Sequence, residues 1–401
     1  MKNTKYKLGE LVEVTRGASL SGQFYAEEGK LIRLTLGNFN MNGGGFKENT
    51  SKTDLYFTGT VRDEFILNEG DIITPLTEQS LGLLGTTARI PESGKYIQSQ
   101  DVALVRCKKG LLDPNFCYYL ISSSIVRQQL SAAAQQTKIR HTSPEKIKDC
   151  TVWVPDFDVQ KNIGRILTDI DNKIAINRQI NDNLEAMAKQ LYDYWFVQFD
   201  FPNEDGKPYK SNGGAMVWNE KLKREIPKEW MASNYTDLFT IGNGQTMPQN
   251  EGLVPAYGGN GIVKMVEISN YPACIIIGRV GANCGSIHYS KVPCWVSDNA
   301  ISICSKNDDW QPFLFYSLKL YNLSKNKGGS SQPLITHEAL KHLYFPMSEK
   351  HINQFCHIVN ELQDLIYSNQ QEILKLTKQR DELLPLLMNG QATVNYHLSA
   401  C

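Results

Sequence analysis

Short loops rich in asparagine, glutamine, arginine and glycine hold the side chains of this 401-residue chain that are best suited to specific chemistry. Asn and Gln can form paired hydrogen bonds with the edge of an adenine, and Arg can do so with a guanine. Lys and Ser beside glycines suit phosphate contacts, because small residues let a backbone come close. The same residue types also fill ordinary turns, so one such loop says little by itself. Their recurrence in two segments of the chain favours nucleic-acid binding.

The candidate DNA-contacting residues form two groups. The group within residues 1–154 comprises Arg16, Asn38, Asn40, Gln79, Gln98, Ser99, Gln136, Lys138 and Arg140. The group within residues 231–345 comprises Asn243, Gln245, Tyr257, Asn260, Arg279, Asn283, Lys325, Lys327, Ser330, Ser331 and Gln332.

Motifs for catalysis are missing from the sequence. It has no phosphate-binding G-x-x-x-x-G-K-[ST] loop, and its paired glycines lack the third glycine and the βαβ context of a dinucleotide site. The Asn/Asp-Pro-Pro-aromatic tetrad of amino-methyltransferases has only a weak echo at 154–157, and no carboxylate–x–Lys pair has a nuclease-like setting. The seven histidines are scattered, and Cys274, Cys284, Cys294 and Cys304 recur every ten residues, which is not metal-ligand spacing. We therefore predict no catalytic residue, no metal and no cofactor in this chain.

The composition fits a folded cytoplasmic protein with reduced cysteines. Hydrophobic residues make up 41% and charged residues 21%, and no apolar run is long enough to span a membrane. The first residues lead into no apolar stretch, so they do not form a secretory signal. The 42 basic and 42 acidic side chains balance, which argues against a polycation that coats nucleic acid.

Two segments have the apolar periodicity of long helices, at about 159–199 and 351–388. Alternating steps of four and three residues give the heptad pattern of a coiled coil, and each position in the second segment lies 192 residues after its counterpart in the first. This internal repeat predicts one plan used twice: a globular domain followed by a long helix. The predicted seam residues are Ile163, Leu167, Ile170, Ile174, Asn181, Leu184, Leu191, Phe355, Val359, Leu362, Ile366, Asn369, Leu376, Leu383 and Leu387.

The two helices are predicted to bury their apolar stripes on each other. A pseudo-twofold axis between equivalent halves makes such a pair antiparallel, with Ile163 opposite Leu387 and Asn181 opposite Asn369. The two Asn side chains either hydrogen-bond across the seam and fix its register or are merely tolerated near solvent. Arg380 interrupts the stripe, and its guanidinium is expected to reach outward to water.

The predicted fold class is α+β, with two mixed α/β globular domains separated by two long helices that form an antiparallel coiled coil. Residues 1–154 and 231–345 are the expected globular domains, and strand-like runs at 71–74, 102–105, 274–277 and 300–303 support this. The expected helical parts are 155–200 and 346–390, with a connector at 201–230 and a tail at 391–401.

Several stretches resemble the specificity (S) subunit of type I restriction–modification enzymes, and the resemblance extends over essentially the whole chain. The residues that carry it are 191–202 (LYDYWFVQFDFP), 205–210 (DGKPYK), 224–230 (REIPKEW), 257–261 (YGGNG), 278–281 (GRVG), 329–336 (GSSQPLIT) and the helical stretch 369–390. The first globular domain has weaker motif support and is assigned mainly by its position and by the likeness of residues 136–155 to the end of the second domain.

The resemblance implies a non-catalytic subunit that recognises DNA. Each globular domain would read one half of a bipartite, asymmetric site, and the helices would set the gap between the halves. Two modification subunits would dock along the helices and methylate adenine with S-adenosylmethionine. Two motor-nuclease subunits, which use ATP and Mg²⁺, would join for restriction.

Two other readings compete with this one. A nuclease or methyltransferase acting alone would need motifs that the sequence lacks. A coiled-coil scaffold whose globular ends bind protein would share the helices but would not need the polar loops.

Overall fold

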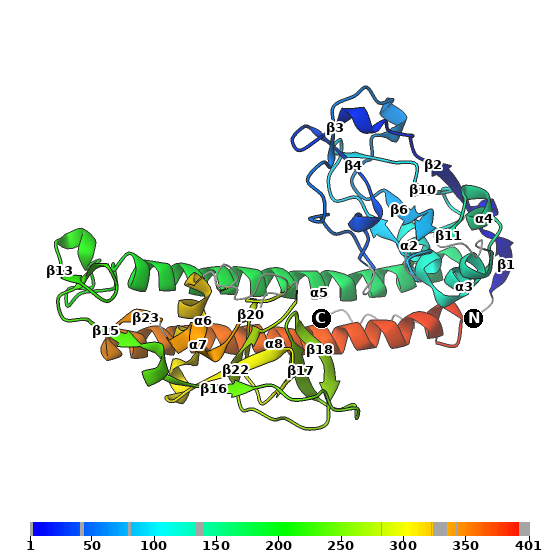
Figure 1. The fold of residues 1–401 in the computed structure, drawn as a ribbon. Helices are drawn as coiled ribbons and strands as arrows, with labels where there is room; N and C mark the ends of the chain where they lie inside the picture. The colour runs from blue at the N-terminus through cyan, green and yellow to red at the C-terminus, as the bar shows by residue number, and fades with distance from the viewer. Residues whose placement is uncertain are drawn as a thin grey trace. The chain divides into compact units, whose positions relative to one another are not determined.

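The computed structural model describes residues 3–40, 44–78, 82–133, 140–281, 283–321, 323, 335–341 and 343–392. The chain forms two compact units: Met1–Ile176 with Glu372–Cys401, and Asn177–Gln371. Each unit contains one globular domain and about half of each of two long helices, α5 (Phe157–Tyr192) and α8 (Glu349–Met388) (Figure 1). No helix within the described ranges is both long and apolar enough to cross a membrane.

The first unit builds a mixed α/β domain. Its helices are α1 (Leu8–Leu11), α2 (Pro114–Ser122), α3 (Ser124–Ala133) and α4 (Pro144–Lys148). Its strands are β1 (Thr4–Lys7), β2 (Val12–Arg16), β3 (Tyr25–Ala26), β4 (Leu31–Arg33), β5 (Tyr56–Phe57), β6 (Ile72–Pro75), β7 (Thr77–Glu78), β8 (Ala88–Arg89), β9 (Tyr96–Ile97), β10 (Val102–Cys107), β11 (Arg140–His141) and β12 (Thr151–Val154).

The central sheet of this unit has the order β2-β10-β6-β8, and its neighbouring strands are antiparallel. Helix α2 begins where Asp113 accepts hydrogen bonds from two backbone amides of the first turn, with Pro114 at the first helical position. Phe116 and Leu120 of α2 lie in one buried core with sheet residues such as Val105 and with Ile163 and Leu167 of α5. The α2 helix thus joins the sheet to the long helix.

The second unit repeats this arrangement. Its helices besides α5 and α8 are α6 (Gln311–Leu320) and α7 (His337–Lys341). Its strands are β13 (Met216–Asn219), β14 (Arg224–Pro227), β15 (Met231–Asn234), β16 (Phe239–Asn243), β17 (Val254–Gly258), β18 (Gly261–Val266), β19 (Cys274–Gly278), β20 (Ile287–Ser290), β21 (Trp295–Val296), β22 (Ala300–Ser305) and β23 (Tyr344–Met347).

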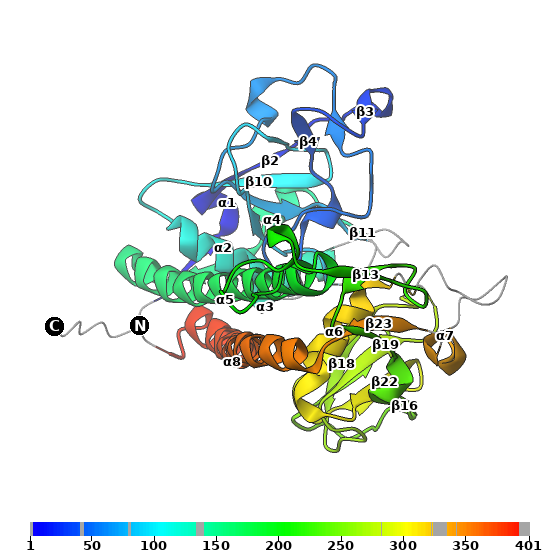
Figure 2. The same ribbon diagram turned by 90° about the vertical axis from the view of Figure 1, so that its left-hand side faces the viewer.

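The central sheet of the second unit has the order β16-β22-β19-β20, again antiparallel between neighbours (Figure 2). Phe313 and Leu314 of α6 share a buried core with Ile277 of the sheet and with Phe355 and Val359 of α8. The pairing of β15 with β23 repeats that of β1 with β12. The same connectivity therefore occurs twice, which confirms the predicted internal repeat and the α+β class.

The two long helices run in opposite directions within each unit. In the first unit, Ile163 shares a core with Leu387, and Lys173 Nζ lies 3.5 Å from Glu372. In the second unit, the side-chain amide of Asn369 donates a 2.9 Å hydrogen bond to Oδ1 of Asn181. Residues later in α5 therefore contact residues earlier in α8, which confirms the predicted antiparallel pairing.

Burial along the helices follows the predicted stripe, with Asn181 8% exposed. The fully buried seam residues are Ile163, Leu167, Ile174, Phe355, Val359, Ile366 and Leu387. The half-buried ones are Ile170, Leu184, Leu191, Leu362, Asn369, Leu376 and Leu383.

Arg380 does not reach outward, so that expectation is wrong. Its side chain is only 10% exposed, and its Nη1 donates a 2.8 Å hydrogen bond to Oδ1 of Asp171. The other carboxylate oxygen of Asp171 accepts a 2.6 Å hydrogen bond from the hydroxyl of Tyr119 on α2. Arg380 also pairs with Asp381 at 2.8 Å, so two carboxylates offset the cost of burying its charge.

The aromatic stretch 191–202 closes the helical segment of α5. After Tyr192 the helix widens into a π-helical turn, Asp193–Val197, and Phe199 then takes a left-handed conformation with φ of 65°. Phe196 and Phe199 pack against Trp230, which comes at the end of the connector. The motif thus positions the connector against the helix end.

Candidate nucleic-acid interface

Eight of the predicted DNA-contacting residues lie outside the described residues. They are Gln79, Gln136, Lys138, Lys325, Lys327, Ser330, Ser331 and Gln332. The other twelve fall into two classes, those whose polar groups face water and those whose polar groups hold the protein together.

Asn38 and Gln98 belong to the second class. Asn38 is 2% exposed, and its amide bonds the backbone of Thr35 and Lys47. Gln98 is 1% exposed, and its Nε2 donates to the carbonyl oxygens of Thr15 and Val102. These buried amides satisfy backbone groups that would otherwise lack partners, so we assign both residues to holding the loops in shape. Asn40 is half-buried, and its backbone amide donates to Gly45.

Arg140 is held by an ion pair with a buried carboxylate. Its Nη1 lies 3.1 Å from Oε1 of Glu78, whose side chain is 2% exposed. Oε2 of Glu78 accepts hydrogen bonds from the backbone amides of Gly82, Leu83 and Leu84. Arg140 thus neutralises the carboxylate that shapes the 82–84 turn.

Arg16, Ser99 and their neighbours meet where strands end in the first domain. Arg16, the last residue of β2, is exposed, and its Nε donates a 2.8 Å hydrogen bond to the carbonyl of Gln100. Ala18 forms a parallel bridge with Ser99. We call residues 16–18 and 98–101, together with Leu76, the first-domain crossing.

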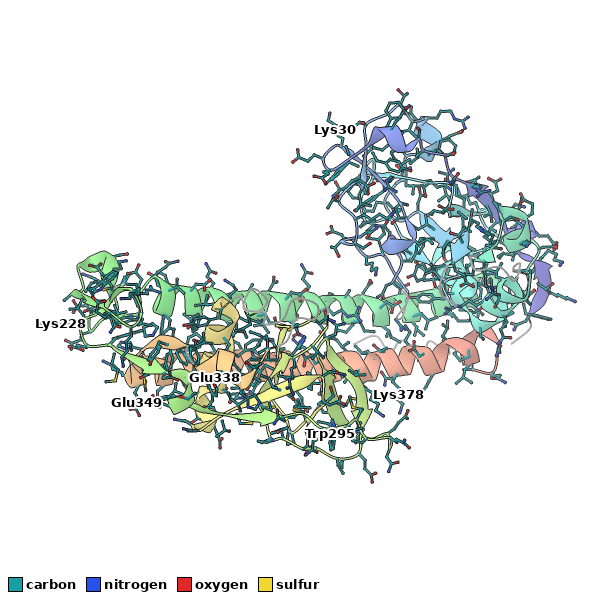
Figure 3. The ribbon with its side chains drawn as sticks, viewed as in Figure 1. Lys30, Lys228, Trp295, Glu338, Glu349 and Lys378 are labelled. Atoms are coloured by element: carbon teal, nitrogen blue, oxygen red, sulfur yellow. The ribbon has the colours of Figure 1, made fainter. Side chains whose placement is uncertain are left out.

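The second domain has a corresponding feature. Asn243, the last residue of β16, and Gln245 are both exposed, and Gln245 forms a parallel bridge with Ser297. Figure 3 shows Trp295 in the second globular domain, and its indole donates to the carbonyl of Gln245 at 3.4 Å. The backbone amide of Arg279, whose side chain is half-buried, donates to the carbonyl of Asn299 at 2.9 Å. Residues 243–245 and 296–299, together with Arg279, are called the second-domain crossing.

The remaining predicted residues lie near the second-domain crossing or in the core. Asn260 and Asn283 are exposed. Tyr257 is 8% exposed, and burial raises the pKa of its hydroxyl to about 12, so it acts as a core residue with a neutral phenol. Gly278 brings backbones together here, because a Cβ on it would lie 2.4 Å from the carbonyl oxygen of Asn283.

Three exposed residues of the crossings, Gln100, Asp298 and Asn299, belong to polar loops that the sequence marks as suited to base edges, but they are not among the individual residues predicted to contact DNA. The signal that could have singled them out within those loops is the matching position of residues 99–101 and 297–299, just ahead of β10 and β22. A match of this kind needs the strand ladders, which single loops do not reveal.

Thiols and metal-binding residues can also be placed. Each cysteine within the described part of the chain is a free thiol. Over the same described residues, no group of three or more His, Cys, Asp or Glu side chains is arranged to hold a metal ion.

Comparisons with known proteins agree with this architecture. The family described as "Type I restriction modification DNA specificity domain" matches residues 2–186 and 227–383. The MjaIX specificity subunit of Methanocaldococcus jannaschii is 24% identical over 316 residues, which cover 72% of this chain and 71% of that protein. The putative MjaX specificity subunit of the same organism is 24% identical over 382 residues, covering 86% and 85%.

A solved structure has the same fold. The S subunit of a type I restriction–modification system from M. genitalium superposes with a TM-score of 0.63 at 19% identity, covering 97% of this chain and 96% of that one. Because the family match spans both globular domains and most of both long helices, this chain belongs to the type I restriction–modification specificity subunits.

Proposed function

We propose that this chain is the non-catalytic DNA-recognition subunit of a type I complex, and that each globular domain reads one half of a bipartite, asymmetric site. The observation that carries the proposal is the repeated domain: one backbone plan occurs twice, with different exposed side chains at its crossings. Two copies of a shared scaffold with different polar surfaces suit the reading of two different half-sites, because base edges are distinguished by side-chain donors and acceptors.

The long helices serve as the spacer in this proposal. Helix α5 has 36 residues, which gives a length of about 54 Å at 1.5 Å per residue. That length exceeds one turn of DNA, about 34–36 Å. The gap between the half-sites would then follow from helix length.

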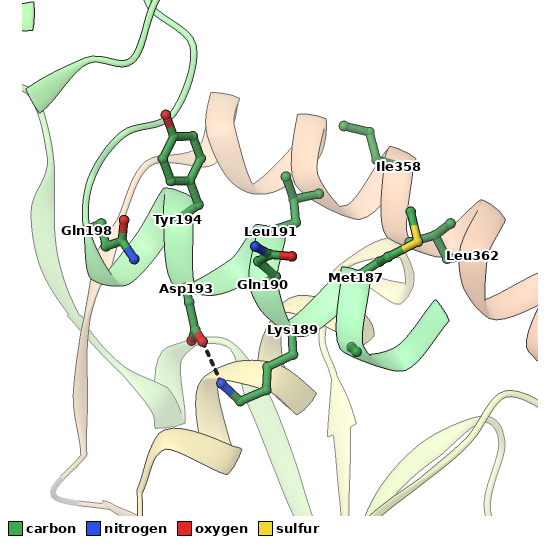
Figure 4. Close-up of a pocket in the computed structure, with 10 residues that line it drawn as sticks. Met187, Lys189, Gln190, Leu191, Asp193, Tyr194, Gln198, Ile358 and Leu362 are labelled. Atoms are coloured by element: carbon green, nitrogen blue, oxygen red, sulfur yellow. Dashed lines mark hydrogen bonds and ion pairs between the residues drawn. The ribbon is translucent and has the colours of Figure 1, made fainter. Parts of the chain in front are cut away.

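The helices also offer a surface for partner subunits. In the second unit, an open groove of about 790 Å³ lies along α5 and α8 (Figure 4). Met187 and Ile358 line it together with Leu191 and Leu362, and Met187 and Ile358 are 56% and 40% exposed. Apolar side chains gathered in one exposed patch are typical of protein interaction sites. The i,i+4 pair of Lys189 and Asp193 lies at its edge.

The internal repeat gives the first unit a related surface. Leu191, Tyr194, Ile358 and Leu362 of the groove correspond, at an offset of 192 residues, to apolar residues of the first unit. Those counterparts are Leu383, Leu386, Ile166 and Ile170. Two similar surfaces on one chain suit two copies of one partner, and we propose that these are the modification subunits.

In this scheme the partners supply all of the chemistry. The modification subunits bind S-adenosylmethionine and methylate adenine, and two motor-nuclease subunits use ATP and Mg²⁺. This chain contributes recognition and spacing and holds no cofactor of its own.

Exchange of one domain tests the proposal. Residues 239–340 are replaced by the corresponding domain of a related subunit with a different specificity, and the complex is assembled with its modification subunits. Mapping of methylated sites should show a change in one half-site and an unchanged other half and gap. A change in both halves would contradict the modular reading, whereas binding to DNA without any sequence preference would favour a protein-binding scaffold.

A further inference from the structure

The two crossings share a set of backbone hydrogen bonds. The amides of Ala18 and Gln245 donate to the carbonyls of Gln98 and Val296, at 2.9 and 3.0 Å. The amides of Leu76 and Arg279 donate to the carbonyls at 101 and 299, at 2.8 and 2.9 Å. Two further pairs of bonds also match. The amide of Val102 donates to the carbonyl of Ser99 as that of Ala300 does to Ser297. The amide of Thr142 donates to the carbonyl of Leu76 as that of Ile335 does to Arg279. The crossing is therefore one construction made twice.

A glycine makes the close approach possible in each copy. A Cβ on Gly17 would lie 2.2 Å from the carbonyl oxygen of Gln98, and a Cβ on Gly244 would lie 1.8 Å from that of Ser297. Both distances are far shorter than van der Waals contact, and the obstructing atoms belong to the backbone. Neither position has room for a side chain, so the backbone shape of both crossings is fixed.

The exposed side chains at matched positions differ. Arg16 in the first domain corresponds to Asn243 in the second, because each pairs with the second residue of the neighbouring strand, Ala103 or Ile301. By the same matching of turns, Gln100 in the first domain corresponds to Asp298 in the second, and Asp101 corresponds to Asn299. Arg16, Asn243, Gln100, Asp298 and Asn299 are all exposed.

This combination has the properties of a reading site. The backbone hydrogen bonds of the crossing are the same in both domains, so at this place the domains differ in their side chains. Arg, Asn and Gln are the side chains that form paired hydrogen bonds with guanine and adenine edges. In contrast, the polar groups of Asn38, Gln98 and Arg140 are bonded to other groups of this protein.

We infer that the two crossings are the sites at which the two domains contact base edges of double-stranded DNA, and that Gln100 and Asn299 are specificity-determining residues. This inference rests on the proposed function, since it locates the surface that reads each half-site. The backbone around Gly17 and Gly244 holds these side chains at a fixed strand end, and exchange of the side chain changes the base that is read.

The test uses the full chain assembled with its modification subunits. Gln100→Ala and Asn299→Ala variants are compared with wild type by mapping methylated sites genome-wide. Each variant should lose about tenfold or more of its discrimination at one base position, and the two should affect different half-sites. Gln128→Ala on α3 and Thr240→Ala on β16 are controls, because these exposed side chains lie outside the crossings in the same domains.

Isosteric variants distinguish the loss of a base contact from a general loss of folding. Gln100→Glu and Asn299→Asp keep the side-chain size but replace a donor with an acceptor, which should shift preference from adenine toward cytosine at the same position. The inference is overturned if wild type methylates a split motif and all four crossing variants keep that motif unchanged, or if either variant alters both halves alike. A wild-type complex with no split motif would instead refute the proposed function.

Discussion

Arg380 is a buried cation in a hydrogen-bond network that spans three elements of the first unit. Asp171 on α5 and Asp381 on α8 accept from its guanidinium, and Tyr119 on α2 donates to Asp171. The network joins the globular domain to both long helices. Since the groups satisfy one another, removal of one leaves another without its partner.

Replacement of Arg380 by Met should lower the free energy of unfolding by about 2 kcal/mol, because Asp171 would lose its hydrogen bond from the guanidinium. Urea unfolding of the full chain measures this effect. Lys173→Met is the matched control, since Lys173 forms an ion pair with Glu372 in which both side chains are about half exposed, and its loss should cost less than about 0.5 kcal/mol. Equal losses for both variants would contradict the assigned role of Arg380.

His351 makes the second unit sensitive to acid. Its ring lies 4.0 Å from that of Phe201 and 5.4 Å from that of Trp230. Burial, with a smaller effect of the Lys350 charge, lowers its pKa from the ordinary 6.5 to about 4. The unfolded chain therefore takes up a proton more readily than the folded chain, so stability from this group is full above about pH 6.5 and is lost as the pH falls toward about 4.

The His351→Gln variant should show a shallower loss of stability between pH 6.5 and pH 4 than wild type, as measured by urea unfolding at each pH. His357→Gln, at an exposed position of the same helix, is the control and should keep the wild-type slope. If the His351 variant also keeps that slope, another group must carry the acid sensitivity.

The sequence could predict which residue types face the seam but not what they bond. Arg380 falls at a heptad position of the stripe, but we expected its guanidinium to reach water, because its partner network includes Tyr119, which is 52 residues from Asp171 along the chain. Asn38 and Gln98 look like exposed loop residues for the same reason, since their partners are distant backbone groups. Such partners become visible only once the strands are paired.

Long helices and buried strands were predictable at the scale of elements. A stripe repeated over more than four heptads determines a helix without help from its neighbours, and apolar runs such as 274–277 and 300–303 lie in the central sheet. Strands of two residues, such as β3 and β5, have no such pattern, because they form only when a tertiary partner is beside them. Helices α2 and α6 were missed, since each is buried on more than one side.

Asn181 and Asn369 form a hydrogen-bonded pair in the middle of the seam. Such a polar pair fixes the register of the two helices but makes the seam less stable than an apolar pair would. Asn181→Leu alone should lower the free energy of unfolding by about 1 kcal/mol, because the amide of Asn369 loses its partner. The double variant with Asn369→Leu should recover this loss and exceed wild type in urea. If the single and double variants are equally stable, the pair does not couple the helices.

The groove on the second unit should bind a partner through its apolar side chains. Met187→Glu with Ile358→Glu puts two charges into it, so the chain should copurify with one modification subunit instead of two, while the unfolding midpoint of the isolated chain stays near that of wild type. Gln371→Glu, at an exposed position of α8 outside the groove, is the control. Normal copurification of the double variant would show that partners bind elsewhere.

At the scale of the whole molecule, the internal repeat connects the sequence to the function. It was detectable because the two helical stripes share one offset, and it implied two equivalent globular domains before any contact was known. The equivalence of the crossings could not be predicted, since it depends on matched hydrogen bonds between strands that differ in sequence.

The most direct test of the account is a genome-wide map of N6-methyladenine in cells that express this chain with its modification subunits. The account predicts one split motif, in which two short and different blocks flank a gap of fixed length and any sequence. Methylation without such a motif, in the presence of the assembled complex, would contradict the claim that the two domains each read one half of the site.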